Sequence, residues 1–205
     1  MYTFGIDIGS TTSKCVVMED GQNIVGTSLL VGGIGTKSPE LAVSQALENA
    51  GVTWDDLAAT AATGYGRNRY EGADYNVSEL SCHGLGAHHT FPTVRTIIDI
   101  GGQDAKVISL DEKGRMNNFL MNDKCAAGTG RFLDVMANIL VVPVDEFAAY
   151  CEKSQNPAQI SSTCTVFAES EVISQLANGV EMEDLIAGIC SSVAVRVGNL
   201  AKRIN

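Results

Sequence analysis

The chain has 205 residues, of which 45% are hydrophobic and 21 are glycine. This composition is typical of a soluble globular protein with one large or two small domains. The net charge of −10 disfavours partners such as nucleic acids and anionic membranes, because both surfaces are themselves negatively charged. The sequence opens on a strand-like segment with no leader or spanning pattern, so we expect a cytoplasmic protein.

The N-terminal half predicts a β-meander followed by mixed strands and helices. Residues that alternate in the strand period predict four strands, at 2–8, 14–19, 24–30 and 57–63. Asp20-Gly21 separates the second strand from the third and predicts a tight hairpin turn. Helical patterns behind a serine predict two helices, 39–49 with Ser38 as N-cap and 78–89 with Ser78 as N-cap.

The opening pattern occurs twice. Ile-Asp-Ile-Gly stands at residues 6–9 and again at 98–101, and a lysine follows each copy, Lys14 or Lys106. Each copy continues as a strand, an acidic turn and another strand. This repeat predicts two similar α/β domains, 1–93 and 94–205, whose loops face each other across a cleft.

Four helices are expected after the second meander, at 128–140, 145–150, 165–176 and 183–204. The first of them opens on the turn Gly128-Thr129-Gly130, and its unpaired N–H groups can bind an anion. Asn178-Gly179 is expected to end the third helix.

The two repeated loops have the chemistry of a nucleotide site. Glycine lets the backbone approach a phosphate, neighbouring hydroxyls donate to its oxygens, and the carboxylates of Asp7 and Asp99 suit a hydrated Mg²⁺. The residues expected to bind ATP or ADP are Gly9, Ser10, Thr11, Thr12, Lys14, Gly101, Gly102, Gln103, Asp104, Gly128, Thr129 and Gly130. Lys14 and Lys106 could each reach a phosphate or only flank a strand, and their recurrence favours a binding role for at least one. The P-loop and G-x-G-x-x-G patterns are absent from the sequence.

Six stretches carry a resemblance to a known family: IDIGSTTSK, TGYGR, SELSCH, IDIGGQDAK, NDKCAAGTGRF and SSTCTVFAESEVIS. They resemble the ATP-dependent activators of 2-hydroxyacyl-CoA dehydratases and, less closely, the ATPase subunits of benzoyl-CoA reductase. Both belong to the superfamily of actin, heat-shock chaperones and sugar kinases. The resemblance covers essentially the whole chain and implies two actin-like (ribonuclease H-like) α/β domains. Relatives continue beyond the last residue of this chain with an adenosine-binding loop, so we expect the second domain to be incomplete.

The resemblance implies a homodimer that holds one [4Fe-4S] cluster between its subunits. Cys125 and Cys164 each precede a helix, where N–H groups and the helix dipole favour a thiolate. A cluster needs four thiolates, so two copies of the chain complete the set. A zinc ion on the same thiolates, or two buried thiols, are the alternatives. The other cysteines, Cys15, Cys82, Cys151 and Cys190, are expected to pack in the core.

Glu79 begins a predicted helix, and in the chaperone branch of the superfamily a glutamate at a comparable place positions the attacking water. We therefore expect Glu79, with Asp7 and Asp99, to serve hydrolysis, although an acid in the first turn of a helix is also favoured by the helix dipole.

The family resemblance implies that ATP hydrolysis drives one low-potential electron into a dehydratase component, in the anaerobic fermentation of amino acids. Ferredoxin or flavodoxin is the expected electron donor. The alternatives are the ATPase subunit of a benzoyl-CoA-type reductase, a small-molecule kinase of the same superfamily, and a metal-bridged dimer without hydrolysis.

Overall fold

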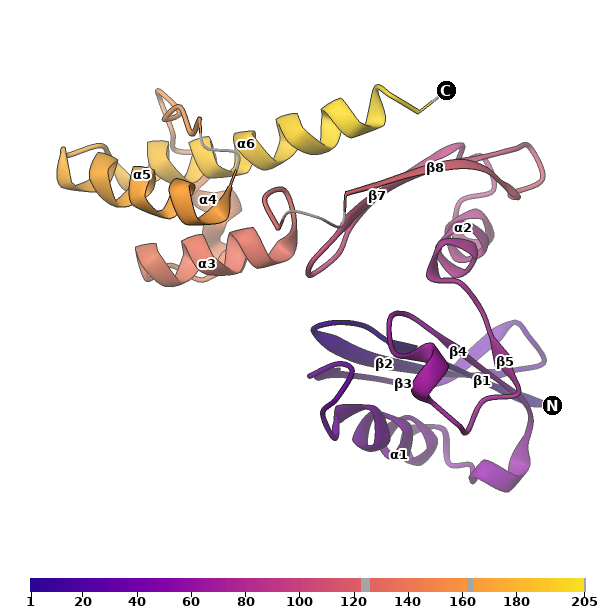
Figure 1. Ribbon diagram of the computed structural model, residues 1–205. Helices are drawn as coiled ribbons and strands as arrows, with labels where there is room; N and C mark the ends of the chain where they lie inside the picture. The colour runs from indigo at the N-terminus through magenta and orange to yellow at the C-terminus, as the bar shows by residue number, and fades with distance from the viewer. Residues whose placement is uncertain (123–125, 162–163, 205) are drawn as a thin grey trace. The chain divides into compact units, whose positions relative to one another are not determined.

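The computed structural model describes residues 1–122, 126–161 and 164–204 and has a mixed α/β architecture (Figure 1). The chain divides into two compact units, Met1–Pro92 and Thr93–Asn205, called unit 1 and unit 2 below.

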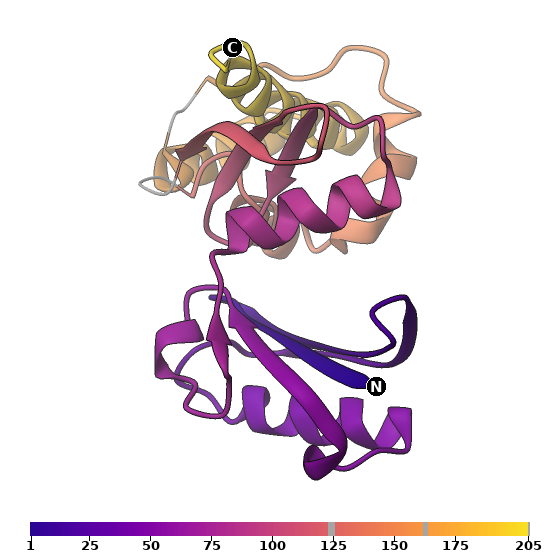
Figure 2. The same ribbon diagram turned by 90° about the vertical axis from the view of Figure 1, so that its right-hand side faces the viewer.

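Unit 1 is built on a five-stranded sheet with the order β3-β2-β1-β4-β5. Its elements are β1 Tyr2–Ile8, β2 Thr12–Glu19, β3 Asn23–Val31, α1 Ser38–Ala50, β4 Leu57–Thr63, β5 Tyr75–Asn76 and α2 Glu79–Thr90. The meander β1-β2-β3 is antiparallel, whereas β4 and β5 add to it in parallel. Figure 2 shows α1 packed on one face of this sheet.

The strand periodicity of the first segment positions the core of unit 1. Phe4, Ile6 and Ile8 lie on one face of β1, are almost fully buried, and pack with Ala42 and Ala46 of α1. The expected hairpin turn is present, since Asp20 has φ 54° and Gly21 has φ 69°. A two-residue turn with both residues in the left-handed region matches the twist of the strands that it joins.

One expected helix cap is wrong. Ser38 is the first residue of α1, and Lys37 occupies the flanking position. The Ser38 hydroxyl instead donates to the carbonyl of Val31 at 2.8 Å, so tertiary contact with β3 takes the group that would have capped the helix. Ser78 does cap α2, because its side chain accepts a hydrogen bond from the amide of Leu80.

Unit 2 repeats the meander and then becomes helical. Its elements are β6 Thr96–Ile100, β7 Ala105–Leu110, β8 Met116–Asn122, α3 Gly130–Leu140, α4 Phe147–Cys151, α5 Thr165–Ala177 and α6 Met182–Ala201. The sheet has the order β6-β7-β8 and is antiparallel throughout. The four helices share one apolar core, to which Phe132, Met136, Phe147, Val172 and Ile189 contribute fully or almost fully buried side chains.

The helix α6 is, among the described residues, the one segment long and apolar enough to cross a membrane by length and composition. The sequence alone predicts no such segment. Its apolar residues Leu185, Ile186, Ile189, Val193 and Val197 are buried in unit 2, as expected for the core helix of a globular unit.

Candidate functional site

The first loop, residues 9–12, is a tight turn between β1 and β2. The amide of Gly9 donates to the carbonyl of Thr12 at 2.9 Å. Asp7 and Lys14 face each other across the strand pair, and Lys14 Nζ lies 2.9 Å from Asp7 Oδ2. The Lys14 side chain is 46% exposed. An exposed ammonium beside a carboxylate can therefore meet a ligand at this loop.

The second loop, residues 101–104, repeats this backbone geometry between β6 and β7. The amide of Gly101 donates to the carbonyl of Asp104 at 2.8 Å, and Asp99 faces Lys106 in register. Lys106 Nζ lies 2.8 Å from Asp104 Oδ1 and 3.5 Å from Asp99 Oδ2. Its side chain is only 5% exposed, so this lysine is enclosed by its carboxylate partners.

A glycine turn after β4 lies against the end of β1. Gly64 has φ +80°, and a Cβ there would stand 2.3 Å from Asp7 Oδ1 and 2.5 Å from the carbonyl O of Ile8. The amide of Gly66 donates to the same carbonyl at 2.8 Å. Only glycine at position 64 permits this approach, because the backbone conformation and the space both exclude a side chain.

The same turn fixes Glu79. Arg67 donates from one guanidinium nitrogen to the carbonyl of Gly64 at 2.9 Å and to Glu79 Oε2 at 3.1 Å. Glu79 is the first residue of α2, and its side chain is mostly buried. Unit 1 thus brings Asp7, Lys14 and the Arg67–Glu79 pair to neighbouring elements. The sequence predicts only a tight turn at 64–67, because nothing in its pattern indicates which carboxylate the arginine meets.

A cavity of about 270 Å³ opens in unit 1 against β1, β2 and β4. Asp7, Lys14, Thr63 and Cys82 are among the residues that line it. The sequence predicts a packing role for Cys82, and the structure puts it on the wall of this cavity. The cavity offers space next to the Asp7–Lys14 pair.

The third glycine turn differs from its expected form. The helix α3 begins at Gly130 rather than Gly128, because Gly128 has φ +90° and Thr129 is extended. The amides of Gly130 and Arg131 donate to the carbonyls of Gly101 and Gly102, both at 2.9 Å. These two N–H groups, expected to bind a phosphate, are therefore occupied by the second loop. Thr129 is fully buried and also donates to the backbone.

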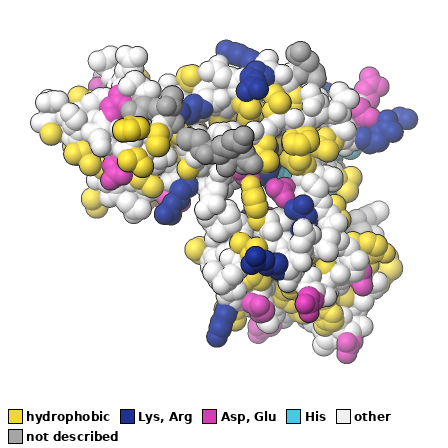
Figure 3. All heavy atoms as spheres, in the orientation of Figure 1, with side chains coloured by type: hydrophobic (Ala, Val, Ile, Leu, Met, Phe, Trp, Pro, Cys, Tyr) yellow, Lys and Arg dark blue, Asp and Glu magenta, His cyan; other side chains and the backbone are white. Residues whose placement is uncertain are grey.

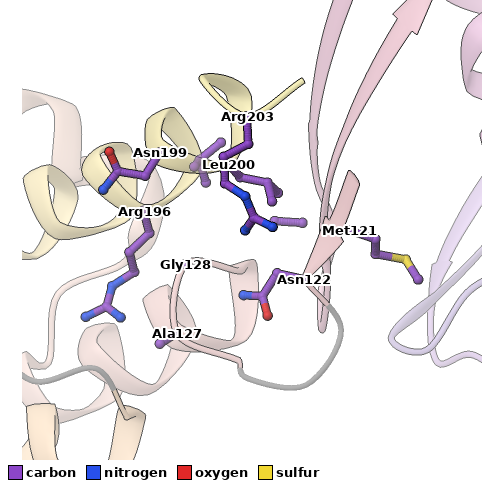
Figure 4. Close-up of a pocket in the computed structure, with 10 residues that line it drawn as sticks. Met121, Asn122, Ala127, Gly128, Arg196, Asn199, Leu200 and Arg203 are labelled. Carbon is purple, nitrogen blue, oxygen red and sulfur yellow. The ribbon is translucent and has the colours of Figure 1, made fainter. Parts of the chain in front are cut away.

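A second cavity, of about 280 Å³, lies between α6 and the Gly128 turn. Figure 4 shows Arg203 extending from the end of α6 toward Asn122, while Arg196 points past Gly128 toward Ala127. A Cβ at Gly128 would touch Arg196 Cδ at 3.4 Å. The described residues that line this cavity include two arginines and no carboxylate, which suits an anion. The sequence gives no signal for either arginine, since they lie apart from every recognised motif.

Of the two candidate cluster ligands, Cys164 lies among the described residues and Cys125 does not. Cys164 flanks α5 directly, is half-buried, and is a free thiol. Such a thiol at a helix start has the chemistry of an iron or zinc ligand. Cys125 lies in 123–125, outside the described residues. Within the described part of the chain, no group of three or more His, Cys, Asp or Glu side chains is arranged to hold a metal ion.

Three other cysteines lie in or against the two cores. Cys15 is buried in unit 1, and burial raises its pKa to about 11. Cys151 and Cys190 pack against the helical core of unit 2. Burial, together with a hydrogen bond to Cys151, raises the pKa of Cys190 to about 12. The raised pKa of Cys15 and Cys190 disfavours the nucleophilic thiolate form of these two side chains.

Comparison with known proteins identifies the fold and the family of the chain. The chain is 60% identical over 205 residues to the (R)-2-hydroxyglutaryl-CoA dehydratase activating ATPase of Acidaminococcus fermentans, covering all of this chain and 78% of that protein. The crystal structure of the (R)-2-hydroxyglutaryl-CoA dehydratase component A from Acidaminococcus fermentans has a TM-score of 0.95 at 59% identity, covering 100% of this chain and 79% of that one. An activator of 2-hydroxyisocaproyl-CoA dehydratase from Clostridium difficile, solved with bound ADPNP, has a TM-score of 0.96 at 54% identity, covering 100% of this chain and 76% of that one.

The expected, less close resemblance to the benzoyl-CoA reductase subunits is also confirmed. A polypeptide of the benzoyl-CoA reductase from Thauera aromatica is 31% identical over 209 residues, covering 98% of this chain and 73% of that protein. The predicted actin-like fold and ATPase class are confirmed as well. The BadF/BadG/BcrA/BcrD ATPase family matches residues 4–205, so the chain belongs to that family.

Proposed function

We propose that this ATPase couples ATP hydrolysis to the transfer of one low-potential electron into a 2-hydroxyacyl-CoA dehydratase in the cytoplasm. The observation that carries the proposal is a thiol, Cys164, at the start of α5 in a chain that also has two loops of phosphate-binding type. The relatives named as dehydratase activators support the choice of partner. The lower identity to the benzoyl-CoA reductase polypeptide favours this choice over that alternative.

Each loop contributes its own groups to nucleotide binding. The exposed ammonium of Lys14 neutralises phosphate charge, and the hydroxyls of Ser10 and Thr11 in the first loop supply further donors. Asp7 in unit 1 and Asp99 in unit 2 are the carboxylates that would hold Mg²⁺, in keeping with the preference of this ion for oxygen ligands and retained water. Lys14 lies beside Asp7, and Lys106 lies beside Asp99.

Glu79 serves as the group that orients the attacking water. Arg67 fixes its carboxylate from one side, and the Gly64 turn fixes Arg67 in turn. A carboxylate whose position is fixed in this way can stay within hydrogen-bond reach of a water, which is the geometric condition for a general base. This role for Glu79 gives the 64–67 turn a part in hydrolysis.

Cys164 is proposed as a ligand of a [4Fe-4S] cluster, with Cys125 as the second. When bound, such a cluster supplies a one-electron couple at low potential. Cys164 occupies the N-cap position of α5, and the positive end of a helix dipole favours an anionic ligand there. Two thiolates per chain require a homodimer, with one cluster on its two-fold axis.

The surface around Cys164 supports a second copy as the partner. Val166 and Phe167 of α5 are about two-thirds exposed, at 66% and 69%. Ile173, two turns further along the same helix, is half-exposed. Figure 3 shows hydrophobic side chains on the surface of the left-hand helical part, where Figure 1 draws α3, α4 and α5. Apolar surface beside a shared ligand is typical of a homodimer interface. Ferredoxin or flavodoxin is the proposed source of the electron.

The test is anaerobic purification of the wild type, Cys164→Ser, Cys125→Ala and the control Cys151→Ser. The wild type and the control should bind about four iron and four sulfide per dimer with a visible absorption band, and both ligand variants should lose them. ATPase activity should be present in the wild type. Zinc in place of iron, or equal iron in all four proteins, would contradict the cluster. Absence of ATP turnover in the wild type would leave only a metal-bridged dimer.

A further inference from the structure

We propose that Thr129 is a positioning residue that couples the second loop to the start of α3. Nucleotide occupancy at Gly101 and Gly102 would then change the first turn of this helix. The inference rests on the proposed nucleotide binding and adds the route by which binding reaches the helical part of unit 2.

Two backbone hydrogen bonds and one longer hydroxyl contact join the loop to the helix. The amides of Gly130 and Arg131 donate to the carbonyls of Gly101 and Gly102 at 2.9 Å, and Thr129 Oγ1 lies 3.3 Å from the same Gly102 carbonyl. The first N–H groups of a helix have no partner within the helix. Here the second loop supplies those partners, so the loop and the helix start share their backbone hydrogen bonds.

Thr129 connects this contact to the preceding backbone. Its hydroxyl donates to the carbonyl of Ala126 at 2.6 Å, and its amide donates to the same carbonyl at 3.0 Å. The side chain is fully buried. A buried hydroxyl in two backbone contacts cannot turn toward solvent without leaving both, so it holds the turn in one conformation.

Close packing makes the contact stiff. A Cβ on Gly130 would stand 3.3 Å from the carbonyl O of Gly101 and 3.6 Å from Cα of Gly102, so the two backbones already touch. Phe132 and Met136 anchor α3 in the core with no exposed surface. A displacement of the second loop must therefore break these bonds or move the helix start with it.

In unit 1 the corresponding loop carbonyl accepts a hydrogen bond from a residue that is not part of a helix. The carbonyl of Gly9 accepts a hydrogen bond from the amide of Ile34 at 3.1 Å. Ile34 lies ahead of α1, which begins only at Ser38. In unit 2 the equivalent carbonyl, that of Gly101, binds the first residue of a helix. Direct coupling between loop and helix is thus a property of the second loop.

Amide hydrogen exchange tests the proposal on the purified chain. Exchange at residues 126–136 is measured without nucleotide and with saturating Mg²⁺ and a non-hydrolysable ATP analogue, with saturation verified by calorimetry. In the wild type, nucleotide should change the exchange rates of the Gly130 and Arg131 amides about tenfold. Thr129→Val should cut this response at least about fivefold, and Thr129→Ser should keep it because it retains the hydroxyl.

The control is Thr36→Val, which removes the hydroxyl that donates to Gly33 in the matching segment of unit 1. It should leave the response of α3 unchanged. A purely structural Thr129 would raise exchange equally with and without nucleotide, and an unchanged ratio would overturn the coupling. So would a wild type that binds nucleotide with no response in α3, a result that needs no variant. A wild type that binds no nucleotide would remove the proposed function as well.

Discussion

The two copies of the Asp-Gly loop share a backbone and differ in the burial of their lysines. In both copies the loop glycine donates to the carbonyl three residues later, and the aspartate faces the lysine across the strands. Lys14 has one carboxylate partner and is 46% exposed, whereas Lys106 has two partners and is 5% exposed. The second carboxylate partner comes from the position where the first copy has Thr12 and the second has Asp104.

This substitution separates two uses of one motif. A lysine is buried at acceptable cost only when carboxylates surround it, so Asp104 permits Lys106 to become part of the interior. Lys14 stays at the surface, where its charge can serve a ligand. A residue type repeated in two copies therefore need not keep one role, and burial decides which role it takes.

The strands that precede the two loops, β1 and β6, also differ in burial. β1 is paired on both sides, with β2 and β4, and its residues Ile6 and Ile8 are buried. Among the described residues β6 is paired with β7 alone, and Ile98 and Ile100 are 51% and 45% exposed. The identical Ile-Asp-Ile sequence thus has a core face in unit 1 and an exposed one in unit 2.

Replacing each lysine by methionine tests directly whether Lys14 and Lys106 contribute differently to stability. Lys106→Met leaves Asp104 buried without this ammonium, so the free energy of unfolding should fall by about 3–5 kcal/mol. Lys14→Met removes an exposed pair and should change it by about 0–1 kcal/mol. Urea denaturation of both variants measures the difference. Equal losses would show that burial of the second lysine has no energetic weight.

Hydrolysis should depend on unit 1 through Glu79. Glu79→Gln keeps the shape of the side chain and removes its basicity, so kcat for ATP should fall about 100-fold with little change in KM. Glu169→Gln, on the helix α5 of unit 2, is the matched control and should leave kcat as it is. Steady-state ATPase kinetics of the three proteins check this. A Glu79→Gln enzyme as fast as the wild type would exclude the proposed role.

Nucleotide affinity should distinguish the exposed lysine from a structural one. Lys14→Met should weaken binding of the ATP analogue about tenfold, or about 1.4 kcal/mol, because one charged contact to phosphate is lost. Lys14→Arg should restore most of it. Isothermal titration calorimetry at fixed ionic strength gives the constants. If affinity is unchanged in the methionine variant, Lys14 only flanks its strand.

The smallest effect concerns Cys15, whose counterpart in the second copy is Val107. Burial raises the pKa of Cys15 from its ordinary value of 9.0 to about 11, so the fold favours the neutral thiol. The contribution of this raised pKa to the free energy of unfolding is complete below pH 9 and is lost as the pH rises from 9 to 11. Cys15→Val should shift stability by less than about 1 kcal/mol at pH 7 and flatten this alkaline loss. Thermal melts from pH 7 to 11 would reveal an unaltered slope if the prediction is wrong.

Local chemistry let the sequence determine most elements of this protein. Alternating apolar residues predicted the strands of the first meander, and the repeat predicted those of the second. Asp20-Gly21 predicted its hairpin, and Ser78 predicted a helix cap. The duplicated Ile-Asp-Ile-Gly predicted two loops of one geometry. These features depend on residues within a few positions of each other, where backbone sterics and hydrogen bonding act without help from the rest of the fold.

Only the tertiary structure decided what the side chains of the site contact. The Arg67–Glu79 pair and the contacts of Thr129 and Gly130 with the second loop join residues distant in sequence. The burial of Lys106 is likewise visible only in the folded unit. The carbonyl of Val31 takes the hydroxyl of Ser38 from its expected cap, and the backbone of Gly128 and Thr129 places the start of α3 at Gly130. Propensity is worth a fraction of a kcal/mol per residue, so a buried hydrogen bond or ion pair outweighs it wherever the fold supplies one.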